Sequence, residues 1–220
     1  MKIYIGFDVT KPECFDVCEY SIQQRTDKIS INKIGNSILS NDIWYRKRNG
    51  LETTDFSICR FLVPYLSNYN GISVFMDDDF LWQCDVKELM NYYDDSKSVM
   101  VCKHDYTPKH TKKWSNNKQT TYKRKNWSSL MMFNNTHPDC KKLDVKTVNE
   151  QTGLWLHQFQ WTENIGAIPL SYNFLVDEYE SYEDIKALHF TNGCPIFDEC
   201  KTQELADKWI DEKRNLDSCR

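Results

Sequence analysis

Three consecutive aspartates, Asp77 to Asp79, have the residue types and the position that suggest chemistry. They directly follow an apolar run from Ile72 to Met76 that is typical of a buried strand. Adjacent carboxylates repel one another and lose hydration when buried, so a bound cation is the natural explanation. Because side chains alternate along an extended segment, we expect Asp77 and Asp79 to face one side and Asp78 the other. The alternative interpretation is a solvated turn or a cap of the next element.

A histidine close to the C-terminus offers a third metal ligand. His189 lies in an apolar, strand-like run and is followed by a turn that contains Gly193 and Pro195. A lone histidine in this position is commonly structural, but the aspartates favour a role as a ligand. Two carboxylates and an imidazole suit Mn²⁺ better than Ca²⁺, which prefers oxygen ligands alone. We therefore predict that Asp77, Asp79 and His189 bind Mn²⁺, with Mg²⁺ as the alternative ion.

Strand-like and helical segments alternate along the chain and would position these side chains. Strand-like runs occur at residues 2–7, 29–34, 72–76, 98–103, 129–133, 166–170 and 187–190. Helical patterns occur at residues 53–66, 85–93 and 202–213. Another helix is predicted to begin directly after Thr10, because Thr10 and Glu13 match a capping box with Pro12 in the first turn. This order predicts an α/β fold with a mixed sheet, in which ligands bind beyond the carboxyl ends of the strands.

The composition narrows the class of protein. The chain has 220 residues and a net charge of -4, and it contains no run of roughly 18 apolar residues that could span a membrane. We find no signal peptide, and the nine cysteines are scattered and odd in number, which favours reduced thiols and a cytoplasmic location. A basic stretch at residues 109–125 predicts a solvated loop or a lid rather than a nucleic-acid site, because no nucleic-acid-binding motif accompanies it. Residues 1–220 are predicted to form one domain.

Six motifs that follow one another along the chain carry a family resemblance. They are TDFSICRFLVPYL, SVFMDDDFLWQCDVKEL, NWSSLMMFN, WLHQFQW, IGAIPLSYNFL and HFTNGCPIF. In this order they resemble the motifs of GT-A glycosyltransferases with an Asp-x-Asp signature, similar to the glycogenin and lipopolysaccharide galactosyltransferase group. In length and motif order the chain also resembles the N-terminal domain of chlorella-virus glycosyltransferases, which would place it in the cytoplasm of a host cell. The resemblance implies a single Rossmann-like GT-A domain with a mixed, mainly parallel central sheet flanked by helices.

The activity implied by the resemblance is that of a hexosyltransferase. It would move a sugar, with glucose as the first expectation, from a UDP-sugar to a glycan or protein-linked glycan acceptor. Asp77, Asp79 and His189 would hold the metal ion, which in turn would hold the diphosphate of the donor. Asp79 is also assigned a catalytic role. The residues assigned to donor binding are Gly6, Phe7, Asp8, Arg60, Asp77, Asp78 and Gly193.

The chemical step leaves alternatives open. An inverting reaction needs a carboxylate that takes the acceptor's proton, for which Glu163 is our choice and Asp177 and Asp198 are alternatives. A retaining reaction needs no such base. The turn at residues 127–129 lacks the family's glycine, and its Trp127 either stacks on a sugar or packs into the core. Two other classes of function remain: a non-catalytic scaffold that binds nucleotide or glycan, and a metal-dependent phosphoryl or nucleotidyl transferase.

Overall fold

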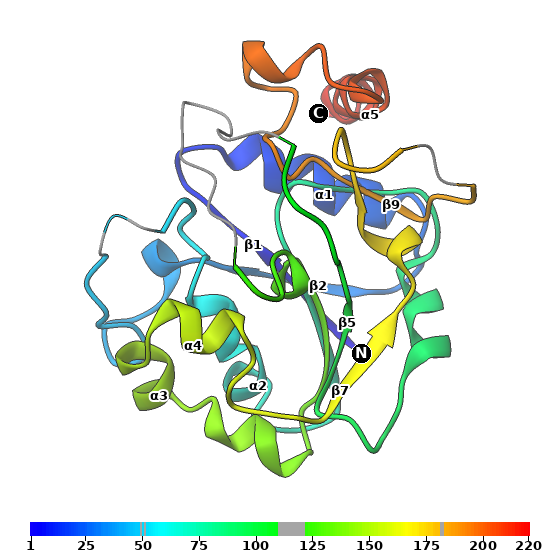
Figure 1. Ribbon diagram of the computed structural model, residues 1–220. Helices are drawn as coiled ribbons and strands as arrows, with labels where there is room; N and C mark the ends of the chain where they lie inside the picture. Colours follow the sequence, from blue (N-terminus) through cyan, green and yellow to red (C-terminus); the bar gives the residue numbers. More distant parts are fainter. Residues whose placement is uncertain (49, 51, 110–121, 181–182) are drawn as a thin grey trace.

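A six-stranded sheet forms the centre of the computed structural model, which describes residues 1–48, 50, 52–109, 122–180 and 183–220 (Figure 1). The strand order is β2-β1-β3-β6-β5-β7. The strands are β1 (Lys2–Gly6), β2 (Ser30–Ile34), β3 (Ile72–Met76), β5 (Val99–Cys102), β6 (Leu130–Asn134) and β7 (Ile165–Ile168). β6 is antiparallel to β3 and β5, whereas the other pairs are parallel. The prediction of a mixed, mainly parallel sheet is confirmed.

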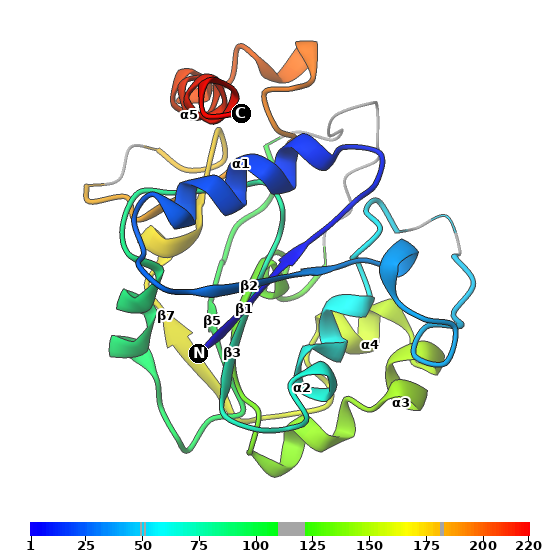
Figure 2. The same ribbon diagram turned by 180° about the vertical axis from the view of Figure 1, so that it is seen from behind.

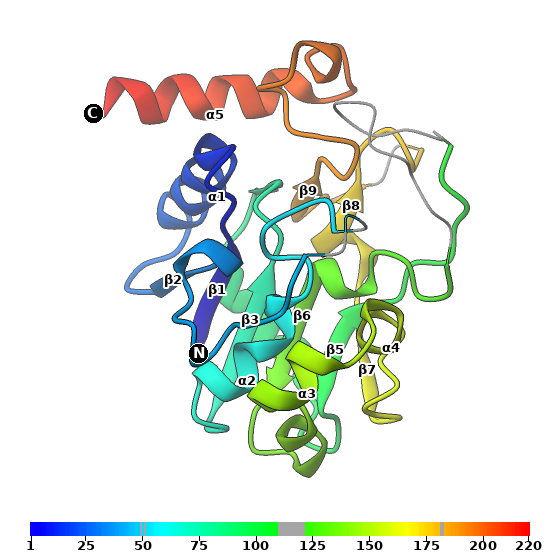
Figure 3. The same cartoon turned by 90° about the vertical axis from the view of Figure 1, so that its left-hand side faces the viewer.

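Helices lie against both faces of this sheet (Figures 2 and 3). α1 (Pro12–Gln23) covers one face, and α5 (Ala206–Ser218) packs on α1. α2 (Val63–Leu66), α3 (Val145–Glu150) and α4 (Gly153–His157) lie on the opposite side. Along β3 the side chains alternate accordingly, because Val74 and Met76 join the core beneath α1 while Phe75 joins the core beneath α2. Short 3₁₀ helices span Asn36–Ile38, Cys59–Leu62, Val86–Tyr92, Trp127–Ser129, Pro138–Lys142, Leu170–Asn173 and Asp198–Cys200.

A second, smaller sheet brings the C-terminal half of the chain to the aspartates. It consists of β4 (Phe80–Trp82), β9 (Ala187–His189) and β8 (Phe174–Leu175), in the order β4-β9-β8. β4 and β9 are antiparallel, with Phe80 opposite His189. The aspartates connect β3 to β4, so this pairing places His189 beside them. The sequence pattern predicted β9 but neither β4 nor β8, since strands of three and two residues are too short to show a period.

Two helical predictions are corrected by the structure. The helix predicted at residues 53–66 begins only at Cys59. Before it, the hydroxyls of Thr54 and Ser57 form a hydrogen bond of 2.9 Å, and this segment is a turn. The capping box is wrong as well. α1 begins at Pro12, but the Thr10 hydroxyl donates a hydrogen bond to Asp8 Oδ1 at 2.7 Å and does not cap the helix. Both corrections concern short polar side chains that bond within a turn.

Two sequence predictions concern membranes and the basic stretch. Among the described residues, no helix is both long enough and apolar enough to cross a membrane. Of the stretch predicted as a loop or lid, residues 110–121 lie outside the described part of the chain. Its last residues, from Tyr122 to Lys125, are described, and two of them, Tyr122 and Lys125, line the site.

Candidate active site

Asp77, Asp79 and His189 lie together at the carboxyl end of β3, as predicted. One potential ligand atom from each of the three side chains lies within 4.8 Å of the others. His189 Nε2 is 3.2 Å from Asp79 Oδ1. Backbone hydrogen bonds hold this arrangement, because the Asp77 amide donates to the Ser129 carbonyl at 3.0 Å and the Phe190 amide donates to the Asp79 carbonyl at 3.0 Å. Two carboxylates and an imidazole at this separation are suited to one divalent cation.

The orientation of His189 matches that of a metal ligand. The ring is buried and stacks on Phe80 with 4.6 Å between centroids. Its Nδ1 lies 2.7 Å from Asn173 Oδ1, and the amide nitrogen of Asn173 donates to Ser129 Oγ at 2.9 Å. Because an amide oxygen only accepts hydrogen bonds, Nδ1 of His189 carries a proton, which leaves Nε2, directed at Asp79, as the ring atom that can bind a metal ion. Nε2 and one carboxylate oxygen each of Asp77 and Asp79 converge within 4.8 Å of one another, so these side chains fit a metal ion.

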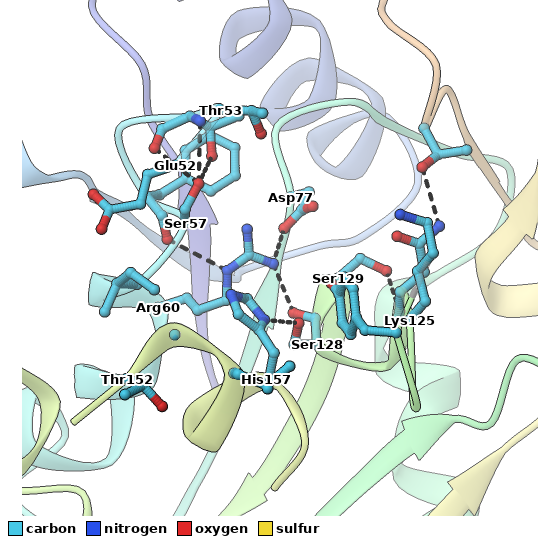
Figure 4. Close-up of a pocket in the computed structure, with 18 of the residues that line it drawn as sticks. Glu52, Thr53, Ser57, Arg60, Asp77, Lys125, Ser128, Ser129, Thr152 and His157 are labelled. Carbon is cyan, nitrogen blue, oxygen red and sulfur yellow. Dashed lines mark hydrogen bonds and ion pairs between the residues drawn. The ribbon is translucent and has the colours of Figure 1, made fainter. Parts of the chain in front are cut away.

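Arg60 connects the aspartates to the helical side of the site (Figure 4). Arg60 is buried, and its guanidinium lies against the rings of Phe56 and Phe75, with Cζ at 5.3 and 4.9 Å from their centroids. Nη1 lies 2.6 Å from Asp77 Oδ1 and donates to the Ser128 carbonyl at 2.9 Å. The guanidinium therefore holds Asp77 in place and adds a fixed positive charge next to the metal cluster.

Asp78 points away from the cluster, as the alternation of side chains predicts. Its carboxylate is fully buried and accepts two hydrogen bonds from Lys11 Nζ, at 2.8 and 2.9 Å. Burial raises the pKa of Asp78, and the ammonium of Lys11 opposes that rise. This ion pair joins the N-terminal end of α1 to the aspartates. The donor-binding role predicted for Asp78 gains no support from this position, which is that of a structural residue.

The end of β1 and the loop after it, with Gly6, Phe7 and Asp8, pack against residues next to the site. A Cβ at Gly6 would lie 2.5 Å from the Phe56 ring, so glycine lets that ring pack against β1. Phe7 contacts the Phe15 ring with 5.6 Å between centroids. Asp8 is buried; burial raises its pKa, but hydrogen bonds to Thr10 and the backbone of Asp55 outweigh that effect and lower the pKa overall. Among the described residues these three do not line the cavity at the metal cluster, and their contacts with a nucleotide stay predictions.

A cavity of about 720 Å³ extends from the metal cluster toward α3 and α4. Such a volume is within the range of sites for nucleotide-sized ligands. Besides Asp77, Asp79, Arg60 and His189, it is lined by residues to which the sequence assigned no role, among them Glu52, Thr54, Ser57, Tyr122, Lys125, Glu150, Gln151 and His157. Several are shown in Figure 4. They come from segments without a motif of paired acids or a strand-end histidine, so residue type alone did not identify them.

His157 lines this cavity as an uncharged imidazole. Its Nδ1 lies 2.8 Å from Ser128 Oγ, and its ring makes an edge contact with Phe61 at 5.2 Å between centroids. Burial, together with the positive charge of Arg60, lowers the pKa of His157 to about 3. The imidazole is therefore neutral at pH 7 and can exchange hydrogen bonds without adding charge. The motif WLHQFQW contains this histidine, but its pattern alone does not indicate a role.

The remaining predicted residues lie outside the cavity. Gly193 has a φ of 129° and shapes the turn after His189, where its amide donates to the Phe190 carbonyl at 2.8 Å. Glu163 lines a separate surface depression with Lys123 and Arg124. The structure therefore does not bring Glu163 to Asp79.

The two alternative bases and Trp127 also lie apart from the cavity. Asp177 accepts a hydrogen bond from the Glu204 amide at 2.9 Å, and the Asp198 side chain is 93% exposed. Trp127 donates through Nε1 to the His104 carbonyl at 2.8 Å and packs against the core. The core interpretation of Trp127 is thus the one that the structure supports.

The mixed sheet with this strand order, with an acidic cluster at the end of β3, matches the fold of solved GT-A glycosyltransferases and confirms the GT-A resemblance. The resemblance to chlorella-virus enzymes stays a prediction. The chain belongs to the same family as Protein CDI of Arabidopsis thaliana, with which it is 43% identical over 220 residues, covering 96% of this chain and 85% of that protein. No family model matches.

Solved glycosyltransferases share the fold at low sequence identity. The galactosyltransferase LgtC, solved in complex with donor and acceptor sugar analogs, is 13% identical with a TM-score of 0.64, covering 98% of this chain and 96% of LgtC. The bifunctional enzyme WbbM is 13% identical with a TM-score of 0.62, and GlyE of Streptococcus pneumoniae TIGR4 is 10% identical with a TM-score of 0.61. The match covers 98% and 96% of this chain but only 50% of WbbM and 59% of GlyE.

Proposed function

We propose that this protein is a metal-dependent glycosyltransferase that transfers a hexose, with glucose as the first candidate, from a UDP-sugar to a glycan or protein-linked glycan. The observation that carries the proposal is the cluster of Asp77, Asp79 and His189 at the carboxyl end of β3, inside a cavity of about 720 Å³. The GT-A fold supports it, because LgtC has the same fold and was solved with donor and acceptor sugar analogs.

In this proposal Asp77, Asp79 and His189 hold Mn²⁺ or Mg²⁺. The bound ion would neutralise the charge that develops on the departing nucleoside diphosphate. The chain's own residues prepare the ligands, since Asn173 keeps the proton on His189 Nδ1 and Arg60 orients Asp77. Asp79 contributes to catalysis by its position in this ligand set.

The proposal is tested by calorimetric titration of UDP into the protein, with Mn²⁺ and then with EDTA. We expect binding that requires the metal and is lost in Asp79→Asn. Asp211→Asn is the matched control, because Asp211 is exposed on α5 and pairs only at the surface with Arg214. Binding without metal, or no binding at all, would contradict the site assignment.

Turnover is tested separately by release of UDP from a panel of UDP-sugars. Metal-dependent release by the wild-type protein, lost in Asp79→Asn and kept in Asp211→Asn, would establish the enzyme. Tight metal-dependent binding of UDP without release from any UDP-sugar, in the presence of glycan acceptors, would instead favour a non-catalytic scaffold.

A further inference from the structure

A buried carboxylate lies in the wall of the cavity outside the proposed metal cluster. The side chain of Glu52 is 5% exposed and lines the same cavity as Asp77 and Asp79 (Figure 4). One of its oxygens, Oε1, lies 3.4 Å from Arg46 Nε. The other, Oε2, is buried, and none of the described residues donates a hydrogen bond to it. A buried carboxylate oxygen without a donor is costly, so Oε2 is suited to a hydrogen-bond donor on a ligand.

Arg46 holds Glu52 in place and determines which oxygen is left for a ligand. Its Nη1 donates to the carbonyl oxygens of Asn149 and Gln151, at 3.2 and 2.6 Å. The side-chain oxygen of Asn149 in turn accepts hydrogen bonds from the amides of Tyr45 and Arg46, at 2.9 and 2.8 Å. These contacts fasten the segment that carries Glu52 to the end of α3. Because Arg46 pairs with Oε1, Oε2 is the oxygen that a ligand can use.

The cavity opens to solvent beside the end of α3. Glu150 and Leu154 line the cavity and are exposed, Leu154 to 54%. Tyr45 is 52% exposed, and its hydroxyl donates to Glu150 Oε1 at 3.5 Å. An exposed aromatic ring and a leucine can pack on the apolar face of a sugar, while carboxylates accept hydrogen bonds from its hydroxyls. The mouth of the cavity therefore has the composition of a sugar-binding surface.

The charges divide the cavity into two parts. At the metal cluster, a divalent cation together with Arg60 would attract the diphosphate of a donor. In the other part Glu52 and Glu150 are negative, and Arg46 balances only one of the two charges. Figure 4 shows Glu52 at the opposite side of the cavity from Lys125. Anionic groups are repelled near Glu52, whereas hydroxyl and ammonium groups are favoured.

On the basis of the proposed function, we propose that Glu52 binds the acceptor glycan, with Oε2 accepting a hydrogen bond from a hydroxyl or ammonium group of the acceptor. The acceptor carries the rest of a glycan or a protein, so it extends through the mouth of the cavity, whereas the metal ion holds the donor. The carboxylate of Glu52 selects neutral and amino sugars over uronic acids, because it repels a second carboxylate.

The test compares Glu52→Gln with wild type and with Glu204→Gln, an exposed control outside the cavity. Arg46 keeps the oxygen of the new amide at the position of Oε1, so the NH₂ group replaces Oε2 and a hydrogen-bond acceptor becomes a donor. Binding to immobilised glycans that end in glucose, glucosamine or glucuronate is measured in the presence of UDP and Mn²⁺.

Wild type and Glu204→Gln should both prefer glycans that end in glucosamine or glucose to those that end in glucuronate. In Glu52→Gln the affinity for glucosamine ends should fall about 10- to 100-fold, because a charge-assisted hydrogen bond is lost. The affinity of this variant for glucuronate ends should stay equal or rise. Calorimetry should show that Glu52→Gln binds UDP with Mn²⁺ as tightly as wild type does.

Equal glycan preference in Glu52→Gln and wild type would overturn the inference, as would a wild-type protein that binds UDP but none of these glycans. A loss of UDP affinity in Glu52→Gln would place Glu52 beside the nucleoside and overturn it as well. Failure of the wild-type protein to bind UDP with Mn²⁺ would refute the proposed function instead.

Should Glu52→Gln not fold, carbodiimide coupling of carboxylates in the wild-type protein, followed by mass spectrometry, replaces the variant. The glucosamine-ended glycan, added with UDP and Mn²⁺, should protect Glu52 and leave Glu204 reactive. Equal labelling of Glu52 with and without this glycan would overturn the inference.

Discussion

His189 Nε2 lies 3.2 Å from Asp79 Oδ1, although one residue ends β9 and the other precedes β4. The contact exists because β4 and β9 pair in antiparallel register, with Phe80 opposite His189. Metal affinity should therefore depend on residues that orient the imidazole as well as on the ligands themselves.

Asn173 is the residue that orients His189, and Asn173→Leu should weaken Mn²⁺ binding by about 10- to 100-fold. The leucine cannot accept the proton of Nδ1, so the imidazole loses both its tautomer and its ring position. Titration of Mn²⁺ monitored by electron paramagnetic resonance measures the effect. Asn173→Asp keeps an oxygen acceptor and should retain most of the affinity. Equal affinity in the leucine variant would show that Asn173 has no such role.

Removing one partner of the buried ion pair of Lys11 and Asp78 should destabilise the fold more than removing both. Asp78→Asn leaves the Lys11 ammonium buried without its carboxylate, which is expected to cost about 3–5 kcal/mol of unfolding free energy. Urea denaturation measures this loss. The double variant Lys11→Met with Asp78→Leu removes both charges and should recover much of it. A single variant as stable as wild type would contradict the assigned structural role.

Gly6 should tolerate no side chain while Phe56 is present. Gly6→Ala would place a methyl group 2.5 Å from the Phe56 ring, and overpacking of this kind costs about 1–3 kcal/mol. Thermal unfolding measures the change. Because Phe56→Leu opens space at that position, the double variant should lose less stability than the sum of the two single variants. Strict additivity would rule out the proposed steric contact.

His104 should make the protein less stable in mild acid. Burial lowers the pKa of His104 to about 3, and its Nδ1 lies 2.6 Å from the Tyr179 hydroxyl. An unfolded histidine titrates near ~6.5, so the unfolded state binds more protons between these values. The stabilising contribution is therefore complete above about pH 6.5 and is lost as the pH falls toward 3. The unfolding free energy is measured at pH 7.5 and at pH 4.5. The difference between the two values should be about 2 kcal/mol smaller in His104→Gln than in wild type.

Glu163 should be dispensable for sugar transfer. It lines a surface depression outside the cavity of the metal cluster, so Glu163→Gln is expected to release UDP from UDP-sugars at the wild-type rate. Asp79→Asn serves as the inactive reference. Loss of activity in Glu163→Gln with unchanged UDP affinity would restore the role of base that the sequence suggested.

The sequence alone determined the features that depend on local pattern. Apolar runs long enough to show a period located the strands of the central sheet, and alternation along the segment after β3 separated Asp77 and Asp79 from Asp78. The ordered motifs indicated the GT-A fold, because they record local constraints at many places along the chain.

Only the tertiary structure decided the contacts between distant segments. The hydrogen bond from His189 to Asn173 and the inward position of Lys125 depend on side chains that meet only when separate elements pack. The same holds for Glu163, whose charge and neighbouring motif favoured a base although the folded chain places it at another surface. Residue type is a local property, whereas burial, tautomer and the walls of a cavity follow from long-range packing that no single segment encodes.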